Sequence, residues 1–438
     1  MTTCPELDVR VAARGGARSG ARPRRRQRVA AGAAAVLLVT MAVLGQRFWS
    51  QRTLTLPAPG VGLGPSGQTV ELAGVRGASS PTETGWLNAG RLPTASGVDP
   101  DLVRDALLDL RTLGHQHGVT VAGWTPAWRY VWPRDSAFVA SAFARTGHLA
   151  DAAAQLSFLQ RVQPTDGRFQ ARYLPDGSGP PDARGVELDG SGWALWGLAE
   201  VAAEVPATKQ AAFVSRYRAL LDRSTAASIT GLDPRTHLPV PSPDYWEVPE
   251  SAPTLATGAT LLAGLRSAEQ LYALIGADDA VRSTRIGADL LQDALVDHFE
   301  RDGYPRHPGG RASSVDLGVT FLLPPFAGVE RPAAVRAWQG SAHYLARPAG
   351  GLAPGGSWRN DGISWTPTVS TYAMAASCRD PAAATRWLDW LDQHRTEAGA
   401  LPEKVLSDGS PASVAPLAWT AAAVVITADQ LQHGCRVP

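Results

Sequence analysis

The chain has 438 residues, of which 41 are basic and 40 acidic, so its formal net charge at pH 7 is +1. This length is enough for one large domain or two ordinary ones. A chain this close to neutrality creates no strong field toward polyanions, so nucleic acid is not among its expected partners.

The basic residues are concentrated near the N-terminus, where eight Arg lie between positions 10 and 28. An uncharged run, residues 29–45, follows directly, and Phe48 and Trp49 lie just beyond it. A membrane span needs roughly 20 apolar residues, with aromatic side chains at its interfaces and positive charge on the cytoplasmic side. The sequence therefore predicts a cytoplasmic tail (1–28), a single-pass transmembrane anchor (29–49) in the cell membrane, and an extracytoplasmic remainder. The alternative is a signal peptide whose cleavage would leave the protein secreted.

This predicted topology divides the three cysteines between the two sides of the membrane. Cys4 would be cytoplasmic, whereas Cys378 and Cys435 would lie outside, where a disulfide can persist. Both a bridge and two free thiols are compatible with the sequence. No Cys/His spacing is typical of a metal site, so neither a metal nor a cofactor is expected.

The composition changes near residue 99. Residues 50–98 are rich in Gly, Pro, Ser and Thr, which favours a linker with short strands at 54–56 and 69–72. Beyond it, apolar residues recur every three or four positions, which indicates amphipathic helices. The predicted helices are about 100–117, 134–146, 148–163, 189–203, 206–226, 253–276, 278–299, 313–321, 331–347, 364–377, 380–395 and 414–433.

Short and long connections alternate between these helices. In a closed ring of antiparallel helices, alternate connections lie on one face, so the six long loops would share one end. Residues 99–438 are therefore predicted to form an all-α (α/α)6 barrel. An extended helical solenoid would need a repeating sequence period, and none is present.

The long loops carry most of the aromatic and paired charged residues. The first contains Tyr130, Trp132, Arg134 and Asp135. Aromatic faces pack on sugar rings, and Arg and Asp bind hydroxyl groups. The plainer interpretation is that Pro133 and Asp135 only begin a helix.

Two glutamates on later loops are candidate acid–base groups. Glu247 follows Tyr245 and Trp246, and burial against aromatic rings would disfavour its charged form, as a general acid requires. Glu403 lies on the sixth loop. Taken alone, each could be a solvated surface charge.

Taken together, the loop motifs resemble the glucoamylase-like family of inverting glycoside hydrolases, which includes bacterial glucoamylases, glucodextranases and some trehalases. The resemblance covers about residues 100–433 and keeps the order of the motifs. Residues 130–135 resemble the substrate loop, 187–196 a conserved helix start, 245–247 the general-acid motif, and 401–405 with 416–419 the general-base segment.

The resemblance implies an (α/α)6 barrel that hydrolyses an oligo- or polysaccharide, with exo action on α-glucosidic bonds. It implies that Glu247 is the general acid and Glu403 the general base. The substrate-binding residues would be Tyr130, Trp132, Arg134, Asp135, Asp189, Trp193, Tyr245, Trp246, Trp358 and Trp419.

The sequence departs from the family at several points. A second acid often follows the general acid, but Val248 stands here, and the Gln that often opens the second motif is Glu187. About 50 residues between anchor and barrel are too few for the N-terminal β-sandwich of bacterial relatives. The alternatives are therefore a hydrolase of a non-glucose cell-wall glycan, a phosphorylase, a non-catalytic glycan-binding barrel and a helical interaction scaffold.

Overall fold

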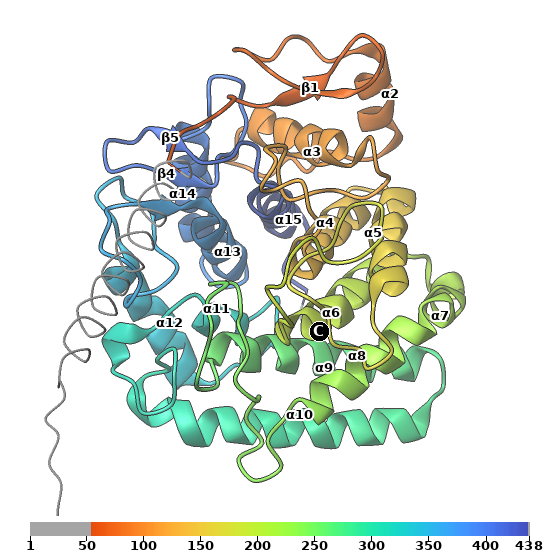
Figure 1. Ribbon diagram of the computed structural model, residues 1–438, viewed down its shortest axis with the longest axis vertical. Coiled ribbons are helices and arrows are strands. Elements are labelled where there is room, and N and C mark those ends of the chain that lie inside the picture. Colours follow the sequence, from red (N-terminus) through yellow and green to blue (C-terminus); the bar gives the residue numbers. More distant parts are fainter. Residues whose placement is uncertain (1–53, 437–438) are drawn as a thin grey trace, which may run out of the picture. The chain divides into compact units, whose positions relative to one another are not determined.

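A computed structural model describes residues 54–436 and contains a closed ring of helices (Figure 1). Each inner helix contacts the next, and the last returns to the first, which closes the ring. The inner helices are α4 (Pro133–Arg145), α6 (Asp189–Glu204), α9 (Leu255–Leu274), α11 (Gly318–Phe321), α13 (Thr366–Ser377) and α15 (Ala418–His433).

An outer layer of helices alternates with the inner one along the chain. Its members are α3 (Pro100–Gly114), α5 (Leu149–Val162), α7 (Ala207–Arg216) with α8 (Arg218–Thr230), α10 (Asp278–Phe299), α12 (Pro332–Leu345) and α14 (Pro381–Gln393). Helices α4 and α13 bury every residue, whereas α14 buries only Ala384, Leu388 and Leu391. A helix that is buried all round lies in the inner layer, and one with a single apolar stripe belongs outside. The all-α barrel predicted from periodicity is confirmed.

Two predicted helices differ in detail. The helix expected over 206–226 is broken at Tyr217, whose buried hydroxyl donates to the Ala153 carbonyl at 2.9 Å. The helix expected over 313–321 is a 3-10 turn, η2 (Ala312–Ser314), followed by the short α11. Asp316 lies between them and accepts from the Gly318 amide at 2.8 Å, so the chain turns there and does not continue one helix.

Residues 54–98 pack against the barrel. Strands β1 (Val61–Leu63) and β2 (Thr69–Glu71) form an antiparallel pair, so the second expected strand is present, whereas residues 54–56 form none. Helix α2 (Pro81–Ala89) was not expected. Its Trp86 stacks on His148, with 3.7 Å between ring centroids, and donates to Asp151 on α5 at 3.0 Å.

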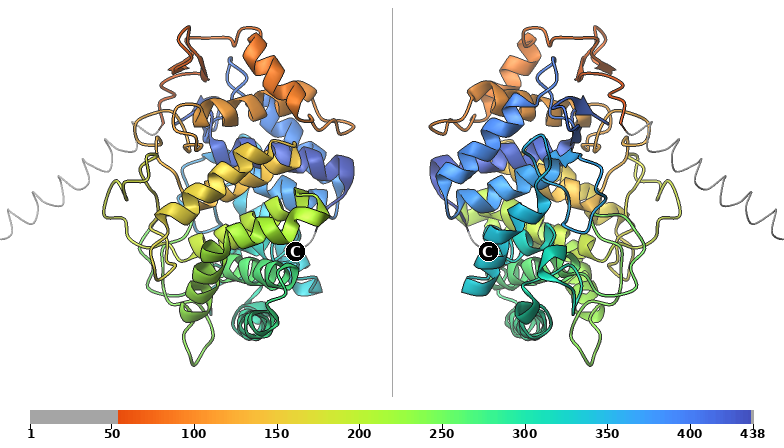
Figure 2. Two further views of the ribbon diagram at one scale, coloured as in Figure 1. Left: turned by 90° about the vertical axis from the view of Figure 1, so that its right-hand side faces the viewer. Right: turned by 90° about the vertical axis from the view of Figure 1, so that its left-hand side faces the viewer.

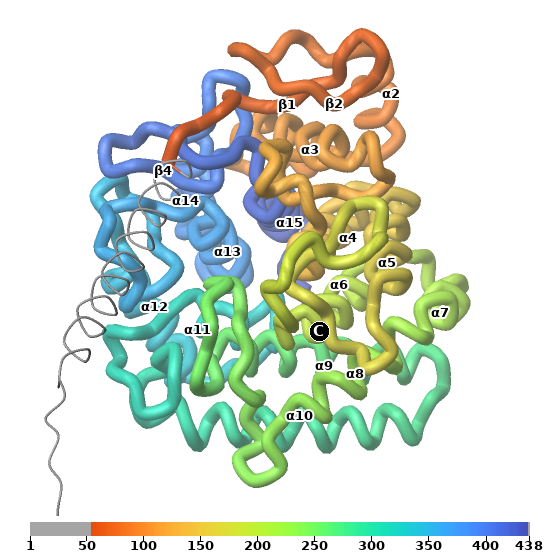
Figure 3. Tube along the Cα trace, viewed as in Figure 1, coloured from red at the N-terminus to blue at the C-terminus, as the bar shows by residue number. Residues whose placement is uncertain are grey.

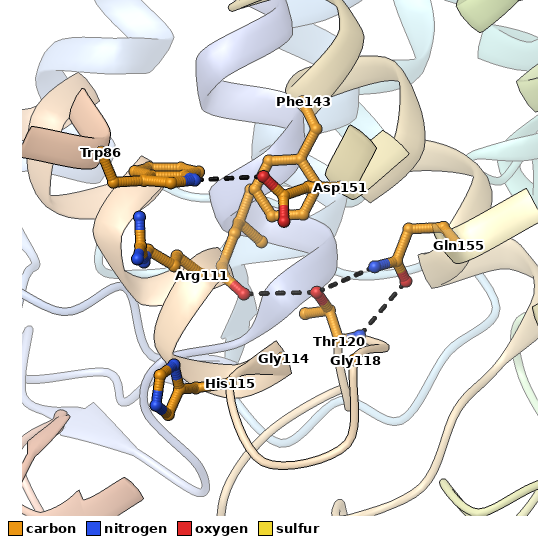
Figure 4. Close-up of a pocket in the computed structure, with 10 residues that line it drawn as sticks. Trp86, Arg111, Gly114, His115, Gly118, Thr120, Phe143, Asp151 and Gln155 are labelled. Atoms are coloured by element: carbon orange, nitrogen blue, oxygen red, sulfur yellow. Dashed lines mark hydrogen bonds between the residues drawn. The ribbon is translucent and has the colours of Figure 1, made fainter. Parts of the chain in front are cut away.

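Figure 4 shows the adjoining pocket of about 220 Å³, where Thr120 donates to the Leu110 carbonyl at 3.2 Å.

The predicted tail (1–28) and anchor (29–49) lie outside the described residues. Within residues 54–436, no helix has the length and apolarity needed to cross a membrane.

A buried charge network ties inner helices together through Arg145 on α4. Its guanidinium donates to Glu200 on α6 at 2.7 Å and to Asp429 on α15 at 2.8 Å. Burial opposes the charge of Arg145, but the two carboxylates outweigh it and raise its pKa. One cation thus neutralises carboxylates from two other helices.

Replacing Arg145 with Met is expected to lower the free energy of unfolding by about 3–5 kcal/mol, because two buried carboxylates lose their counter-ion. Urea denaturation would measure the change. The matched control is Arg282→Met, which removes the exposed partner of Asp279 and should cost no more than about 1 kcal/mol. Equal losses in both variants would contradict the role of the network.

Cys378 and Cys435 form a disulfide between the end of α13 and the end of α15, with their Cα atoms 5.0 Å apart. The sequence was compatible with a bridge or with two free thiols, and the structure has the bridge. The bridge closes a loop between residues 57 positions apart, which restricts the unfolded chain.

The Cys435→Ser variant is expected to unfold with a free energy lower by about 2–4 kcal/mol. Adding dithiothreitol to the wild type should have a similar effect in the same urea titration. Cys4→Ser serves as the control, since it removes a thiol without touching this bond. A wild type whose stability is unaffected by reduction would refute the prediction.

Candidate active site

All six long loops lead from an outer helix to the N-terminus of an inner helix, so they emerge at the same end of the ring. Figure 2 shows these loops gathered on one side of the barrel and the short turns on the other. The predicted site residues on the first, third, fifth and sixth loops are therefore brought to one end.

Arg134 and Asp135 occupy the first turn of α4, just after Pro133. The Arg134 guanidinium lies 4.4 Å from the ring centroid of Trp419, and its Nη2 is 3.3 Å from Asp135 Oδ2. Burial raises the pKa of Asp135, and the charge of Arg134 opposes this. Arg134 Nε and Nη1 are buried without a hydrogen-bond partner, so the side chain has donors to spare.

Glu247 is held in a tight turn on the third loop. Its amide donates to the Asp244 carbonyl at 2.7 Å, and the Trp246 amide donates to Asp244 Oδ1 at 2.9 Å. The φ angle of Glu247 is 54°, a left-handed conformation that is strained for a non-glycine residue and often marks functional sites. Its carboxylate contacts Arg184 Nη1, and its Oε1 lies 3.8 Å from Arg134 Nη2.

These contacts differ from the environment expected from the sequence. Burial against Tyr245 and Trp246 was expected to disfavour the charged form of Glu247. Instead the carboxylate faces two guanidinium groups, which favour the charged form.

A buried arginine anchors the turn that carries Glu247. The Arg306 guanidinium lies over Trp246, 3.8 Å from its ring centroid, and donates to Asp244 at 2.8 Å. It also donates at 2.6 Å to both Asp316 and Glu250. Burial raises the pKa of Asp316, and Arg306 opposes this. Glu250, the next acid after Val248, therefore belongs to the support of the loop.

Glu403, on the sixth loop, lies directly before the central strand of a small sheet. The sheet consists of β3 (Ser364–Trp365), β4 (Lys404–Val405) and β5 (Pro411–Ala412) in antiparallel register. The Glu403 amide donates to the Val414 carbonyl at 2.8 Å, and its own carbonyl accepts from Thr366 at 3.0 Å. Its carboxylate accepts from Ser413 Oγ and lies 3.3 Å from Lys404 Nζ. Its backbone and its carboxylate are therefore both held.

The two glutamates both lie near the Arg134–Asp135 pair. Glu247 reaches Arg134 directly, and the negative charge of Glu403 contributes to the raised pKa of Asp135. Two carboxyl groups from opposite loops of the ring thus border one buried ion pair.

Tryptophans connect these loops. Trp358 packs edge-on against both Trp246, at 4.7 Å between centroids, and Trp365, at 5.6 Å. A buried indole N–H without a partner costs about 1–3 kcal/mol, so such groups call for an explanation, such as a functional role. The indole nitrogens with no hydrogen-bond partner include those of Trp132, Trp246, Trp358, Trp365 and Trp419.

Other predicted substrate-binding residues are placed differently. Arg172 lies over the rings of Tyr130 and Trp132, at 4.4 Å and 5.1 Å. The Tyr245 hydroxyl is committed to the backbone, since it donates to the Pro354 carbonyl at 2.8 Å. Trp193 is only 1% exposed and packs in the core of the ring against Phe138, Phe321 and Phe326, which leaves its faces unavailable to a sugar.

Asp189 is the first residue of α6 and is not its N-cap, which is Leu188. It accepts from Trp193 Nε1 at 3.3 Å. Burial raises the pKa of Asp189 to about 7, and burial together with the neighbouring Asp189 raises the pKa of Glu187 well above its usual value. These two buried acids lie beside Arg134, whose charge opposes the rise in both pKa values.

Arg184 and Asp182 were not recognised in the sequence. Arg184 contacts Glu247, and its Nε lies 3.5 Å from Asp182 Oδ2. The only signal was a closely spaced pair of opposite charges in a long loop, which is common on protein surfaces.

No family model matches the sequence, and no curated protein matches it. Solved structures match the fold. A wild-type glycosidase has a TM-score of 0.65 at 21% identity, covering 81% of this chain and 99% of its own. A bacterial glucoamylase complexed with acarbose scores 0.66 at 18% identity, covering 81% and 58%. A glucoamylase from Saccharomycopsis fibuligera scores 0.60 at 13% identity, covering 80% and 95%. This chain has the fold of the glucoamylase-like glycosidases.

Proposed function

We propose that the protein is an inverting, exo-acting glycoside hydrolase that cleaves α-glucosidic bonds. The observation that carries the proposal is the placement of Glu247 and Glu403 beside the buried Arg134–Asp135 pair. The fold shared with glucoamylases supports it. A non-catalytic glycan-binding barrel would not need two carboxyl groups held on opposite loops.

The chemistry follows from these side chains. The terminal sugar would hydrogen-bond to Asp135 and to Arg134, which lies over the Trp419 ring. Glu247, protonated, would donate its proton to the glycosidic oxygen as the bond from that oxygen to the anomeric carbon breaks. Glu403, ionised, would take a proton from the water that attacks the same carbon from the opposite face. The products are a shortened saccharide and a free sugar of inverted configuration.

A substrate panel tests the proposal. The purified full chain would be incubated with α-glucans, maltose, trehalose and bacterial cell-wall glycans, and released sugars would be identified by chromatography. Release of glucose from an α-glucan end is expected. The control is the Glu247→Gln/Glu403→Gln double variant, which should release nothing. Binding of a glycan without any product would favour the glycan-binding alternative.

We also propose that residues 29–49 anchor the protein in the cell membrane, with the barrel outside. The Cys378–Cys435 disulfide supports an extracytoplasmic location, because such bonds persist in oxidising compartments. Membrane fractions of the native host should contain the full-length chain and retain it after carbonate extraction. A soluble product lacking these residues would indicate a cleaved signal peptide.

A further inference from the structure

The carboxylate of Glu247 contacts two cations, and these two differ in exposure. Oε1 lies 3.8 Å from Arg134 Nη2, and Oε2 contacts Arg184 Nη1. The Arg134 side chain is 8% exposed, packed on Trp419 and fixed in α4, whereas that of Arg184 is 31% exposed on a loop. Of these two partners, Arg184 is the one that can leave.

Arg184 has a second carboxylate within reach. Its Nε lies 3.5 Å from Asp182 Oδ2, and Asp182 also pairs with Arg172. The side chains of Arg172, Asp182, Arg184, Glu247, Arg134 and Asp135 therefore form a chain of alternating charge. Glu187 adds negative charge near its Arg134 and Arg184 members, and Asp189 adds negative charge near Arg134.

The stretch directly before Arg184 borders open space. Residues 177–183 line an open cavity of about 730 Å³ together with Arg161, Gln170 and Tyr173. Gly177, Gly179 and Gly185 have positive φ angles, so this stretch uses conformations that favour glycine. Figure 3 traces this loop and the loop of Glu247 at the same end of the barrel.

These contacts conflict with the role proposed for Glu247. A carboxylate between two guanidinium groups is held ionised, whereas a general acid must carry a proton when the bond breaks. Arg134 would remain to bind the terminal sugar. Loss of the contact with Arg184 would remove one cation and allow the carboxyl group to accept a proton from solvent.

We propose that Arg184 is a displaceable positioning residue, which holds Glu247 ionised in the free enzyme and moves to Asp182 when the leaving-group sugar enters. This inference rests on the proposed function. It predicts that Arg184 sets the pH range in which Glu247 is protonated. The proton comes from solvent, so productive substrate binding is accompanied by the uptake of one proton.

Infrared spectroscopy tests the coupling without relying on activity. The C=O stretch of protonated Glu247, identified by its loss in Glu247→Gln, would be followed against pH in the free full-length chain. In Arg184→Gln its titration midpoint should move to higher pH, by about one unit or more, because an opposing cation is lost. Arg184→Lys should restore a midpoint close to that of the wild type. Arg161→Gln, which removes a cation that lines the cavity, should leave the midpoint unchanged.

Kinetics on maltose provide the second measurement. The alkaline limb of kcat/KM should move to higher pH in Arg184→Gln, since Glu247 must be protonated to act. The inference would be overturned if Arg184→Gln changed neither the infrared titration midpoint of Glu247 nor the alkaline limb of kcat/KM. An equal shift in Arg161→Gln would overturn it as well. A protein that cleaves no glycoside but shows the infrared shift would refute the proposed function and leave the ionic coupling intact.

Discussion

The Glu247→Gln variant is expected to lose about 10²–10⁴-fold in kcat on an unactivated disaccharide, because the glycosidic oxygen would leave without a proton. Gln keeps the shape of the side chain, and the turn is fixed by Asp244 and by Arg306 on Trp246. The free energy of unfolding should therefore change little. Initial rates on maltose and urea denaturation would measure the two effects.

An activated substrate separates this role from a structural one. An aryl α-glucoside with a nitrophenolate leaving group needs little proton donation, so Glu247→Gln should recover most of its activity on it. The Asp176→Asn variant is a control, since it removes an exposed carboxylate of the second loop that accepts from Ser178 and that the mechanism does not use. Equal losses of Glu247→Gln on both substrates would contradict the assignment of Glu247 as the acid.

The Glu403→Gln variant should also lose about 10²–10⁴-fold in kcat, but for a different reason. Without a base the attacking water keeps its proton, so a better leaving group cannot compensate. The small sheet of β3, β4 and β5 and the contact with Ser413 should preserve the fold. Rates on maltose and on the aryl glucoside should fall together.

Azide offers a direct control for Glu403. In Glu403→Ala, azide can replace the activated water as a nucleophile that needs no base, and a glucosyl azide of inverted configuration is expected. The same addition should not help Glu247→Ala on maltose. If azide fails to rescue Glu403→Ala but an activated leaving group does rescue it, Glu403 is the general acid and Glu247 the general base.

The spacing of apolar residues was sufficient to predict the barrel, because the side of a helix that is apolar can be determined from the sequence of that helix alone. An inner helix such as α13 carries only apolar and small polar residues and is buried on all sides, whereas an outer one such as α14 has a single apolar side. The failures occur where tertiary contacts override the local pattern. The helix predicted over 313–321 is interrupted at Asp316, where that side chain turns to Arg306.

The candidate site could be predicted only in part for a similar reason. Motifs identified the loops of Glu247 and Glu403, but not which side chains contact them. Arg184 meets Glu247 across 63 residues of sequence, and nothing local to either residue indicates the contact. Trp193 shows the converse problem, because sequence cannot tell which side of a fully buried helix faces the core and which faces the site.

The stereochemistry of hydrolysis tests the central claim most directly. Proton NMR would follow the anomeric signals during the first minutes of hydrolysis of the aryl α-glucoside, whose leaving group contributes no glucose, before mutarotation mixes the products. Direct attack by a water activated by Glu403 predicts that the newly freed reducing end first appears as β-glucose. Initial appearance of α-glucose would indicate retention of configuration and contradict the assignment of Glu247 and Glu403 as an acid–base pair.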